Sequence, residues 1–439
     1  MAVENSAIAA ASGTGKHMTE AATRRLKARY AAERRFRLIG LAAIVFSLAA
    51  LAVLLTTILS NGFTAFRQTH VRLEIEFTAD QVAPPGTTDP RQIMQGNYGA
   101  LILAALQQRF PEVRSRGERR QLQGLISAGA ESQLGRMVVA EPGLIGTKRQ
   151  VWLPTSSDVD VFVKGQVDTG AAEGERKIKD TQVKWIEALR ASGDLELQFN
   201  TRFFTGADSR EPELVGVWGG VVGSFYTLLI TLIVAFPLGI MAAIYLEEFA
   251  PKNRWTEIIE VNINNLAAVP SIVYGLLGLA VFIGFFGMPR SAPLVGGLVL
   301  ALMSLPVIII AARAALRAVP PSIRQAALGL GASPLQAVLH HALPLAMPGI
   351  LTGTIIAMAH ALGETAPLLM IGMVAFIVDV PVSPVDAATV LPVQVFMWAD
   401  SAERGFVEKT SAAIIVLLVF LLLMNLAAIL LRKKFERRW

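Results

Sequence analysis

Six long runs of mostly apolar residues divide this chain. A helix needs about 20 mostly apolar residues to cross a lipid bilayer, so each run predicts a membrane-spanning helix. We therefore expect an α-helical integral membrane protein with six transmembrane helices. The runs cover residues 38–59, 217–246, 263–286, 294–315, 349–376 and 412–431.

Positive charge is concentrated just outside the first and the last of these runs. Basic residues cluster before residue 38 and again after residue 431, and such clusters mark the cytoplasmic side of a membrane. Both ends are therefore expected in the cytoplasm, which agrees with an even number of spans. The first run starts too late and is too long for a cleavable signal peptide. We expect a basic segment at 1–37, the first transmembrane helix at 38–60 and a basic tail at 433–439.

The stretch 61–213 has the pattern of a folded domain, because it is too long for a connecting loop and mixes both signs of charge. By alternation of the spans it is expected outside the cell membrane, which is the periplasm if the cell is a Gram-negative bacterium. Period-two alternation predicts strands, and longer periodic runs predict helices. We expect an inserted α+β domain in which Asp158 and Asp160 lie on a solvated strand face. The predicted strands are 71–77, 151–153 and 158–163, and the predicted helices are 98–122, 126–139 and 178–190.

Composition narrows the chemistry. Of the 439 residues, 53% are hydrophobic and 17% are charged, whereas soluble domains have roughly 25% charged residues. The chain has no cysteine, which excludes disulfides, cysteine-bound metals and thiol catalysis. Residues 12–16 (SGTGK) resemble a phosphate loop superficially, but the first glycine is missing and His17 replaces the required Ser or Thr. We expect no cofactor, no metal site and no enzyme activity, with any ATP hydrolysed on a separate chain.

The loop at about 317–345 joins the fourth and fifth spans and is expected on the cytoplasmic side. Its small residues and its glycine suggest a helix, a turn and a second helix, and small residues let another surface approach the backbone. An ordinary alanine-rich connection is the alternative. The residues that carry the pattern are Gln325, Ala326, Ala327, Gly331, Leu343 and Pro344.

The fifth span contains an ionisable pair. Glu364 lies near the middle of an apolar run, where a charge is unfavourable and usually faces a cavity or a partner. His360 precedes it by one helical turn on the same face, and Thr365 follows it. This pair either belongs to a transport pathway or gate, or stabilises the helix packing.

Three other residues near the cytoplasmic side, in the third and fourth spans, are candidates for the same pathway. Pro270 predicts a kink in the third span, at a position suited to a gate. Arg313 and Arg317 lie one turn apart at the end of the fourth span. They either attract an anion in the pathway or anchor the topology.

Four segments together resemble one family. The loop pattern, A-A-x-x-x-G followed by L-P, is similar to the coupling loop of ABC importer permeases. Residues 216–431 and the first span resemble the permease subunits of Pst-type phosphate ABC importers, and 61–213 resembles an extra region of unknown function that some of these permeases carry. The matching segments are Gly239–Glu248, Val269–Gly275, Gly363–Leu368 and Leu391–Val395.

The sequence departs from this family at two positions. Gln325 stands where the family's loop usually has Glu, so a salt bridge to the ATPase is not expected there. His360 stands where the family usually has Arg, and a cation at that position becomes dependent on pH because imidazole titrates near neutral pH.

The resemblance implies a type I ABC permease fold at 214–432 and a function. The chain would be the permease subunit of an ATP-driven phosphate importer in the bacterial inner membrane, and would form half of the pathway. Implied partners are a second homologous permease, a dimer of ATP-binding subunits and a periplasmic phosphate-binding protein. The alternatives are an ABC permease for sulfate, molybdate or another oxyanion and, from a different class, a proton-coupled secondary transporter, which would need several intramembrane acids and no coupling loop.

Overall fold

The computed structural model describes residues 20–82, 89–167, 173–374 and 377–435. The phosphate-loop-like run at 12–16 and the end of the basic tail, 436–439, lie outside these residues. The chain divides into two units, residues 1–60 and 61–439. The first unit contains most of helix α2 (Glu20–Ala65), whose apolar stretch is long enough to cross a membrane.

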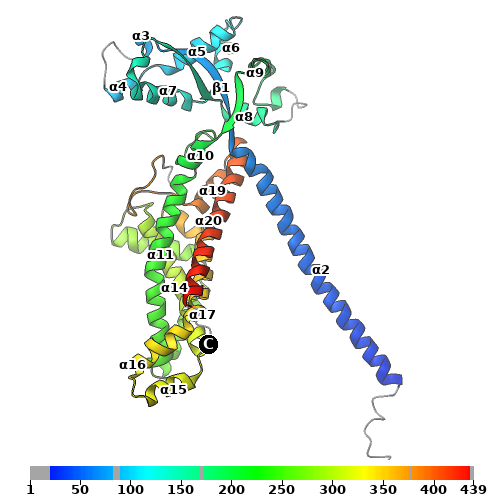
Figure 1. Cartoon of the computed structure of the whole chain (residues 1–439), viewed down its shortest axis with the longest axis vertical. Helices are drawn as coiled ribbons and strands as arrows, with labels where there is room; N and C mark the ends of the chain where they lie inside the picture. Colours follow the sequence, from blue (N-terminus) through cyan, green and yellow to red (C-terminus); the bar gives the residue numbers. More distant parts are fainter. Residues whose placement is uncertain (1–19, 83–88, 168–172, 375–376, 436–439) are drawn as a thin grey trace, which may run out of the picture. The chain divides into compact units, whose positions relative to one another are not determined.

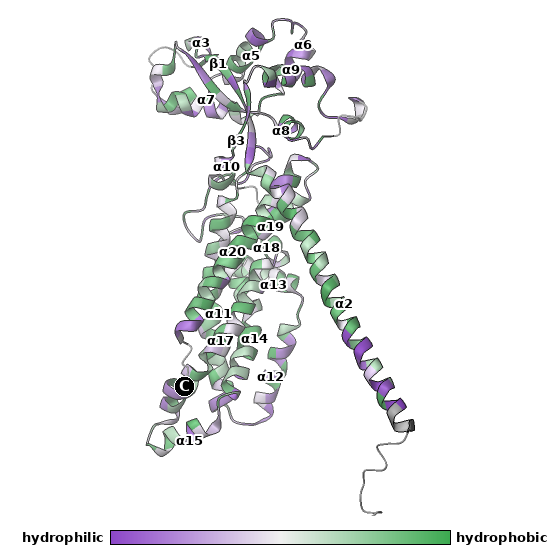
Figure 2. Cartoon of the chain, turned by 45° about the vertical axis from the view of Figure 1, so that its right-hand side comes forward, coloured by the Kyte–Doolittle hydropathy of each residue, from purple (hydrophilic) through white to green (hydrophobic). Residues whose placement is uncertain are grey.

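The described residues contain five helices that are long and apolar enough to span a membrane, and up to six if one bent pair counts as a span. These correspond to the six predicted runs, and their apolar character is visible in Figure 2. Besides α2, the spanning helices are α11 (Trp218–Ile244), α14 (Pro293–Arg317), α17 (Leu343–Gly363) and α20 (Gly405–Phe435). The bent pair is α12 (Arg254–Ala267) followed by α13 (Ser271–Gly278) with its continuation η4 (Leu279–Phe285). Like η4, the elements η3 (Tyr245–Phe249) and η5 (Ala337–Ala342) are short π-helices.

Glycine allows these helices to pack closely. A side chain at Gly239 would lie 2.7 Å from Ile308, so α11 and α14 touch through a position that has no Cβ. The same holds between α14 and α17, where a Cβ at Gly353 would lie 2.2 Å from Ala311. Close approach through small residues is a principal source of helix association in a bilayer, where no hydrophobic driving force acts between helices.

The third span is bent by 100° between α12 and α13, as the proline predicted. Pro270 lies at the break with extended backbone, and the Tyr274 hydroxyl donates a hydrogen bond to the carbonyl of Leu266 across it (2.7 Å). The same carbonyl also accepts the amide of Val269 (3.2 Å), so the hydroxyl adds a side-chain bond that links α13 to the last turn of α12.

The prediction of one continuous helix at 349–376 is wrong. Helix α17 ends at Gly363, Glu364 follows with extended backbone, and a short helix α18 (Ala366–Met370) begins after Thr365. Pro367 explains the break, because its ring lacks an N–H and would clash with the carbonyl four residues earlier. Glu364 therefore lies at a helix end and not within a helix. Helix α19 (Leu391–Ala399) precedes α20.

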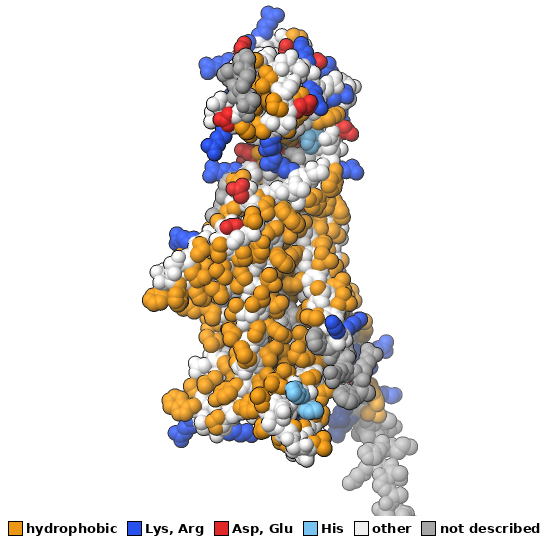
Figure 3. Space-filling model, turned by 60° about the vertical axis from the view of Figure 1, so that its left-hand side comes forward, with side chains coloured by type: hydrophobic (Ala, Val, Ile, Leu, Met, Phe, Trp, Pro, Cys, Tyr) orange, Lys and Arg blue, Asp and Glu red, His pale blue; other side chains and the backbone are white. Residues whose placement is uncertain are grey.

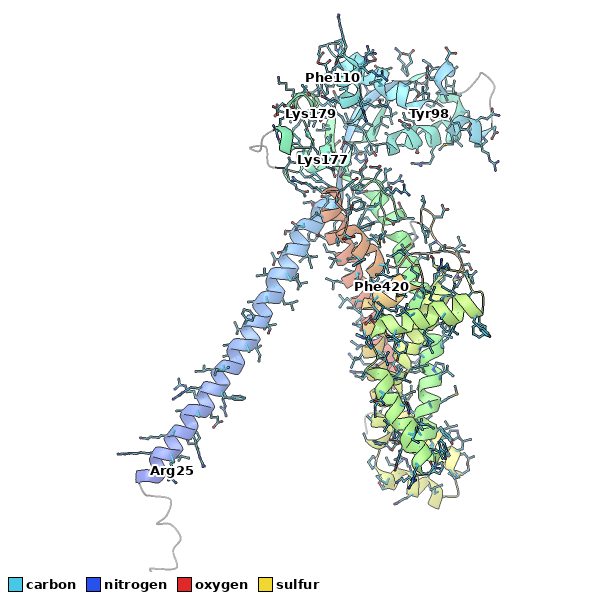
Figure 4. All side chains as sticks on the ribbon, turned by 180° about the vertical axis from the view of Figure 1, so that it is seen from behind. Arg25, Tyr98, Phe110, Lys177, Lys179 and Phe420 are labelled. Atoms are coloured by element: carbon cyan, nitrogen blue, oxygen red, sulfur yellow. The ribbon has the colours of Figure 1, made fainter. Side chains whose placement is uncertain are left out.

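Residues 67–199 form the predicted α+β domain (Figure 1), which we call the α/β domain below. It is built on a three-stranded antiparallel sheet with strand order β2-β1-β3. Alternate residues of β1 (Val71, Leu73 and Ile75) are buried against helices, which include the labelled Tyr98 and Phe110 in Figure 4. The strands are β1 (Arg67–Glu76), β2 (Lys148–Pro154) and β3 (Leu195–Phe199), and the short 3-10 helices are η1 (Pro142–Leu144) and η2 (Glu173–Glu175). The helices, including one that follows β3, are α3 (Ala79–Val82), α4 (Pro90–Met94), α5 (Tyr98–Arg109), α6 (Arg116–Gln123), α7 (Gly129–Ala140), α8 (Ser157–Val163), α9 (Asp180–Ala191) and α10 (Thr201–Thr205).

The structure differs from the sequence-based predictions in this domain at three predictions and one omission. Residues 158–163 form helix α8 and not a strand, and Asp160 is buried (2% exposed) and not solvated. The predicted helix 98–122 is two helices, because Ser115 and Glu118 form a capping box that starts α6. Strand β3 was missed, although 195–199 alternates with period two.

A buried carboxyl between α10 and α11 gives a pH-dependent prediction. Glu213 is 4% exposed, and its Oε2 has no hydrogen-bond partner among the described residues. Burial raises the pKa of Glu213 above its ordinary value of 4.5, so the folded chain favours the neutral acid. Stability that is present below that value is lost as the pH rises through the raised pKa.

We therefore expect Glu213→Gln, which is neutral at every pH, to increase the Tm of the purified chain. The gain should be absent near pH 4 and should grow toward about pH 8, where the wild-type carboxyl is forced to ionise. Thermal unfolding of both proteins across this range measures it. A gain of equal size at both ends of the range would contradict the titration of Glu213.

Candidate functional site

The segment between α14 and α17 folds as a helix, a turn and a second helix. Helix α15 (Pro321–Gly329) is followed by Gly331 with φ of 88°, then by α16 (Pro334–Gln336) and η5. Glycine adopts this left-handed conformation without strain. The amides of Gly331 and Ala332 bond back to the carbonyls of Leu328 and Ala327, which is the usual closure of a helix C-terminus. We call residues 321–342 the coupling segment.

The outward face of the coupling segment is more apolar than its pattern of small residues predicts. Gln325 and Ala326 are exposed as expected, but Leu330 is 91% exposed and Leu328 and Leu335 are also exposed. Exposed leucines at the end of a helix bundle indicate a surface that another protein covers. Of these leucines, Leu328 lies in α15, Leu330 directly follows that helix and Leu335 lies in α16.

Ala327 is only 5% exposed, and it packs within this chain instead of facing outward. Leu343 and Pro344 are half-buried where α17 begins. These three residues therefore support the coupling segment from behind, whereas Gln325 and Ala326 belong to its outward face.

Arg313 and Arg317 are held in an ion-pair network at the same end of the bundle. Both contact the carboxylate of Glu247 in η3, which continues α11, at 3.3 Å for Arg313 Nε and 2.8 Å for Arg317 Nε. Arg313 also pairs with Glu260 of α12. The structure thus gives both arginines carboxylate partners, and it does not bring them into contact with His360 or Glu364.

Arg324, which no sequence pattern marked as functional, connects the coupling segment to two spanning helices. Its Nε lies 3.1 and 3.0 Å from the two carboxylate oxygens of Glu248, and its Nη2 also binds Glu248. The same guanidinium donates to the carbonyls of Leu316 (2.9 Å) and Val319 (2.8 Å), where α14 ends. Glu248 is 10% exposed and Arg324 is 20% exposed. A displacement of α15 must therefore move, or break, its attachment to α11 and α14.

The break after α17 brings together the second group of predicted residues. His360 Nε2 lies 3.1 Å from Glu364 Oε1. The His360 side chain is 67% exposed and that of Glu364 is 17% exposed. Thr365 is the N-cap residue of α18, and its carbonyl accepts the amides of Leu368 and Leu369. An imidazole and a carboxylate on the accessible side of an apolar helix are not expected to face lipid, since polar side chains in spans face a partner or a water-filled space.

The two broken spans touch each other. A Cβ at Gly275 in α13 would lie 2.7 Å from the Cα of Pro367 in α18, so the helix after the Pro270 bend packs directly on the segment after Glu364. Irregular backbone at membrane depth is tolerated where it is buried in protein or lines a cavity. In the view of Figure 3, apolar side chains cover the helices, and charged side chains gather at the ends.

Comparisons with known proteins agree with this architecture. Residues 235–439 match the family model "Binding-protein-dependent transport system inner membrane component", and residues 23–173 match "Domain of unknown function (DUF3333)". The chain is 31% identical over 217 residues to the "Phosphate transport system permease protein PstA 1" of Mycobacterium tuberculosis, covering 49% of this chain and 70% of the relative. It is 35% identical over 173 residues to the "Probable ABC transporter permease protein YqgI" of Bacillus subtilis, covering 39% of this chain and 58% of the relative.

Among solved structures, the chain is similar to the MetNI methionine ABC transporter, with 17% identity, a TM-score of 0.40 and coverage of 51% of this chain and 95% of that chain. That likeness is too low to support a conclusion. The sequence relatives are sufficient to assign the chain to a family. The chain belongs to the family of binding-protein-dependent transport system inner membrane components, which are the permease components of ABC transporters and have no ATPase activity.

Proposed function

We propose that this chain is the permease subunit of an ATP-driven phosphate importer in a bacterial inner membrane. The observation that supports a coupling role is the exposed leucines of the coupling segment. Arg324 attaches this segment to α11 and α14 through its ion pair and hydrogen bonds. A separate ATPase dimer would bind the outward face of this segment. Movement of that dimer would then tilt the two helices, because the attachment is polar, partly buried and directional.

The substrate assignment rests on the relatives and on the broken spans. The M. tuberculosis relative is a phosphate transport permease by its printed name, and it is 31% identical to this chain over 217 residues. Glu364 is suited to accept a hydrogen bond from a protonated phosphate or to hold a cation of the partner permease. A permease for sulfate or molybdate remains the second candidate, since the coupling segment and the fold serve any oxyanion equally.

The same proposal assigns partners and orientation. The exposed side of α17, which includes Ile356 (61% exposed) and His360, would face a second homologous permease, so that each subunit forms half of the pathway. A periplasmic phosphate-binding protein would deliver the anion. Both termini and the coupling segment would be cytoplasmic, and the α/β domain would be periplasmic, in accord with the basic residues at 24–37 and 432–434.

Transport measurements in a strain that lacks the chain test this function. We expect uptake of radiolabelled phosphate to be lost in the deletion strain and restored by the wild-type chain, but not by Leu330→Glu, since a carboxylate would be buried against the ATPase. Excess sulfate or molybdate should not compete. Lys177→Met, which changes an exposed lysine of the α/β domain, serves as the control and should restore uptake fully. Uptake of sulfate or molybdate in place of phosphate would contradict the substrate assignment and leave the permease assignment intact.

A further inference from the structure

Four charged side chains are buried where the α/β domain contacts the first turn of α20. Asp160 lies in α8 and Lys164 is the residue that directly follows this helix, whereas Glu408 and Lys409 lie in α20. None of the four side chains is more than 4% exposed. Two cations and two carboxylates cancel in charge. No step of the proposed transport function uses these residues.

The four groups form a continuous chain of ion pairs. Lys164 Nζ lies 2.6 Å from Asp160 Oδ2 on α8 and 2.8 Å from Glu408 Oε1 on α20. Lys409 Nζ lies 3.0 Å from the same Glu408 oxygen. Lys164 therefore joins a carboxylate of the domain to a carboxylate of a spanning helix.

Neutral groups of the protein make further hydrogen bonds with three of these charged side chains. Asp160 Oδ1 accepts from the Thr69 amide (2.8 Å) and hydroxyl (2.7 Å) at the start of the sheet. Glu408 Oε2 accepts from the Thr64 hydroxyl (2.9 Å), and Lys409 donates to the carbonyl of Ala65 (3.4 Å). Buried charges are tolerated when they are paired and fully hydrogen-bonded, and removing one member leaves an uncompensated charge. Such a network specifies one geometry, whereas apolar packing alone tolerates sliding.

A steric observation points to the same contact independently of charge. Gly405 is the first residue of α20, and a Cβ there would lie 1.9 Å from the Ser157 hydroxyl oxygen at the start of α8. It would also lie 2.8 Å from Pro212. The two helices meet at their first residues so closely that only glycine fits. Beside this point, Phe406, Ala412 and Ala413 of α20 pack with Phe203, Trp398 and their neighbours in one buried cluster.

We infer that the α/β domain is an anchor for the transport helices: it fixes the first turn of α20 through the Asp160–Lys164–Glu408–Lys409 network. This gives the domain of unknown function a role within the permease itself. The inference does not depend on the transported substrate or on the coupling segment. An anchored helix end moves together with the domain, so any tilt of α20 during transport would be shared by the sheet.

Amide hydrogen exchange of the purified full chain tests the anchor directly. Lys164→Met should accelerate exchange in residues 406–412 by roughly 100-fold, because Glu408 is left buried without its bridging cation and the helix end opens locally. Gly405→Val should accelerate exchange in the same residues with all four charges intact. Lys177→Met is the matched control. Its lysine pairs with Asp158 of the same α8, but at 3.7 Å and with 57% of the side chain exposed, so exchange should not change.

A double-variant comparison separates a direct link from a general loss of stability. Once Lys164 is absent, Glu408→Gln should add little, so the effect of the double variant should fall well below the product of the two single effects. The inference is overturned if Lys164→Met and Gly405→Val exchange like Lys177→Met, or if the two single effects multiply. Unchanged exchange with lost phosphate uptake would also overturn it, since the domain would then act by contacting another component.

Discussion

Replacing Arg324 by methionine is expected to stop transport while the complex still assembles. The variant keeps the length and the apolar stem of the side chain, but it removes the guanidinium that binds Glu248 and the carbonyls of Leu316 and Val319. Breaking a buried pair costs about 3–5 kcal/mol, and the partial exposure of Arg324 lowers this to about 2–3 kcal/mol. The coupling segment would then keep its outward leucines but lose its attachment to α11 and α14.

Phosphate uptake and ATP hydrolysis must be measured on the same complex to distinguish lost coupling from lost assembly in Arg324→Met. We expect ATPase subunits to co-purify with Arg324→Met and to hydrolyse ATP, with phosphate uptake reduced at least about tenfold, equivalent to ~1.4 kcal/mol on the transport barrier. Arg254→Met, which changes an exposed arginine in the first turn of α12, should transport normally. Leu330→Glu should fail earlier, by losing the ATPase. Normal uptake by Arg324→Met would show that the attachment of α15 does not transmit force.

The spans could be predicted from the sequence because a bilayer enforces them. A run of about 20 apolar residues has few alternatives to a helix, and Pro270 marked the bend because proline removes a helical hydrogen bond. The same effect of proline predicts a helix break within the run at 349–376. Pro367 follows Glu364 by three residues, but the apolar character of the whole run concealed the break.

The contacts of charged residues could not be predicted, because they depend on which helix ends meet. Arg313 and Arg317 are one turn apart in the sequence, but only the fold shows Glu247 and Glu260 facing them. Asp160 is a sharper case. A carboxylate in a short alternating run indicates a solvated strand face, and its burial is stable only because Lys164 and Thr69 are brought to it.

Glu364→Gln is expected to reduce phosphate uptake at least about tenfold with the complex assembled and hydrolysing ATP. Glutamine keeps the shape of the side chain at the break after α17, but it removes the charge that contacts His360 at 3.1 Å. If the pair serves only packing, the loss should appear as reduced assembly, with uptake falling in proportion. Quantifying the permease that co-purifies with the ATPase, beside uptake in the same cells, separates the two outcomes.

His360→Arg completes this test because it places a guanidinium, which is charged at every physiological pH, at the position of the imidazole. Arginine stays charged over the whole physiological range, whereas an imidazole gains and loses a proton within it. In a pathway, the variant should retain uptake and flatten its dependence on pH between about 5.5 and 7.5. His360→Gln is the matched control, since it keeps a polar group that cannot become a cation. A pH profile that is identical in the wild type and in His360→Arg would mean that the charge at residue 360 takes no part in moving the anion. The polar pair would then only stabilise the break between α17 and α18.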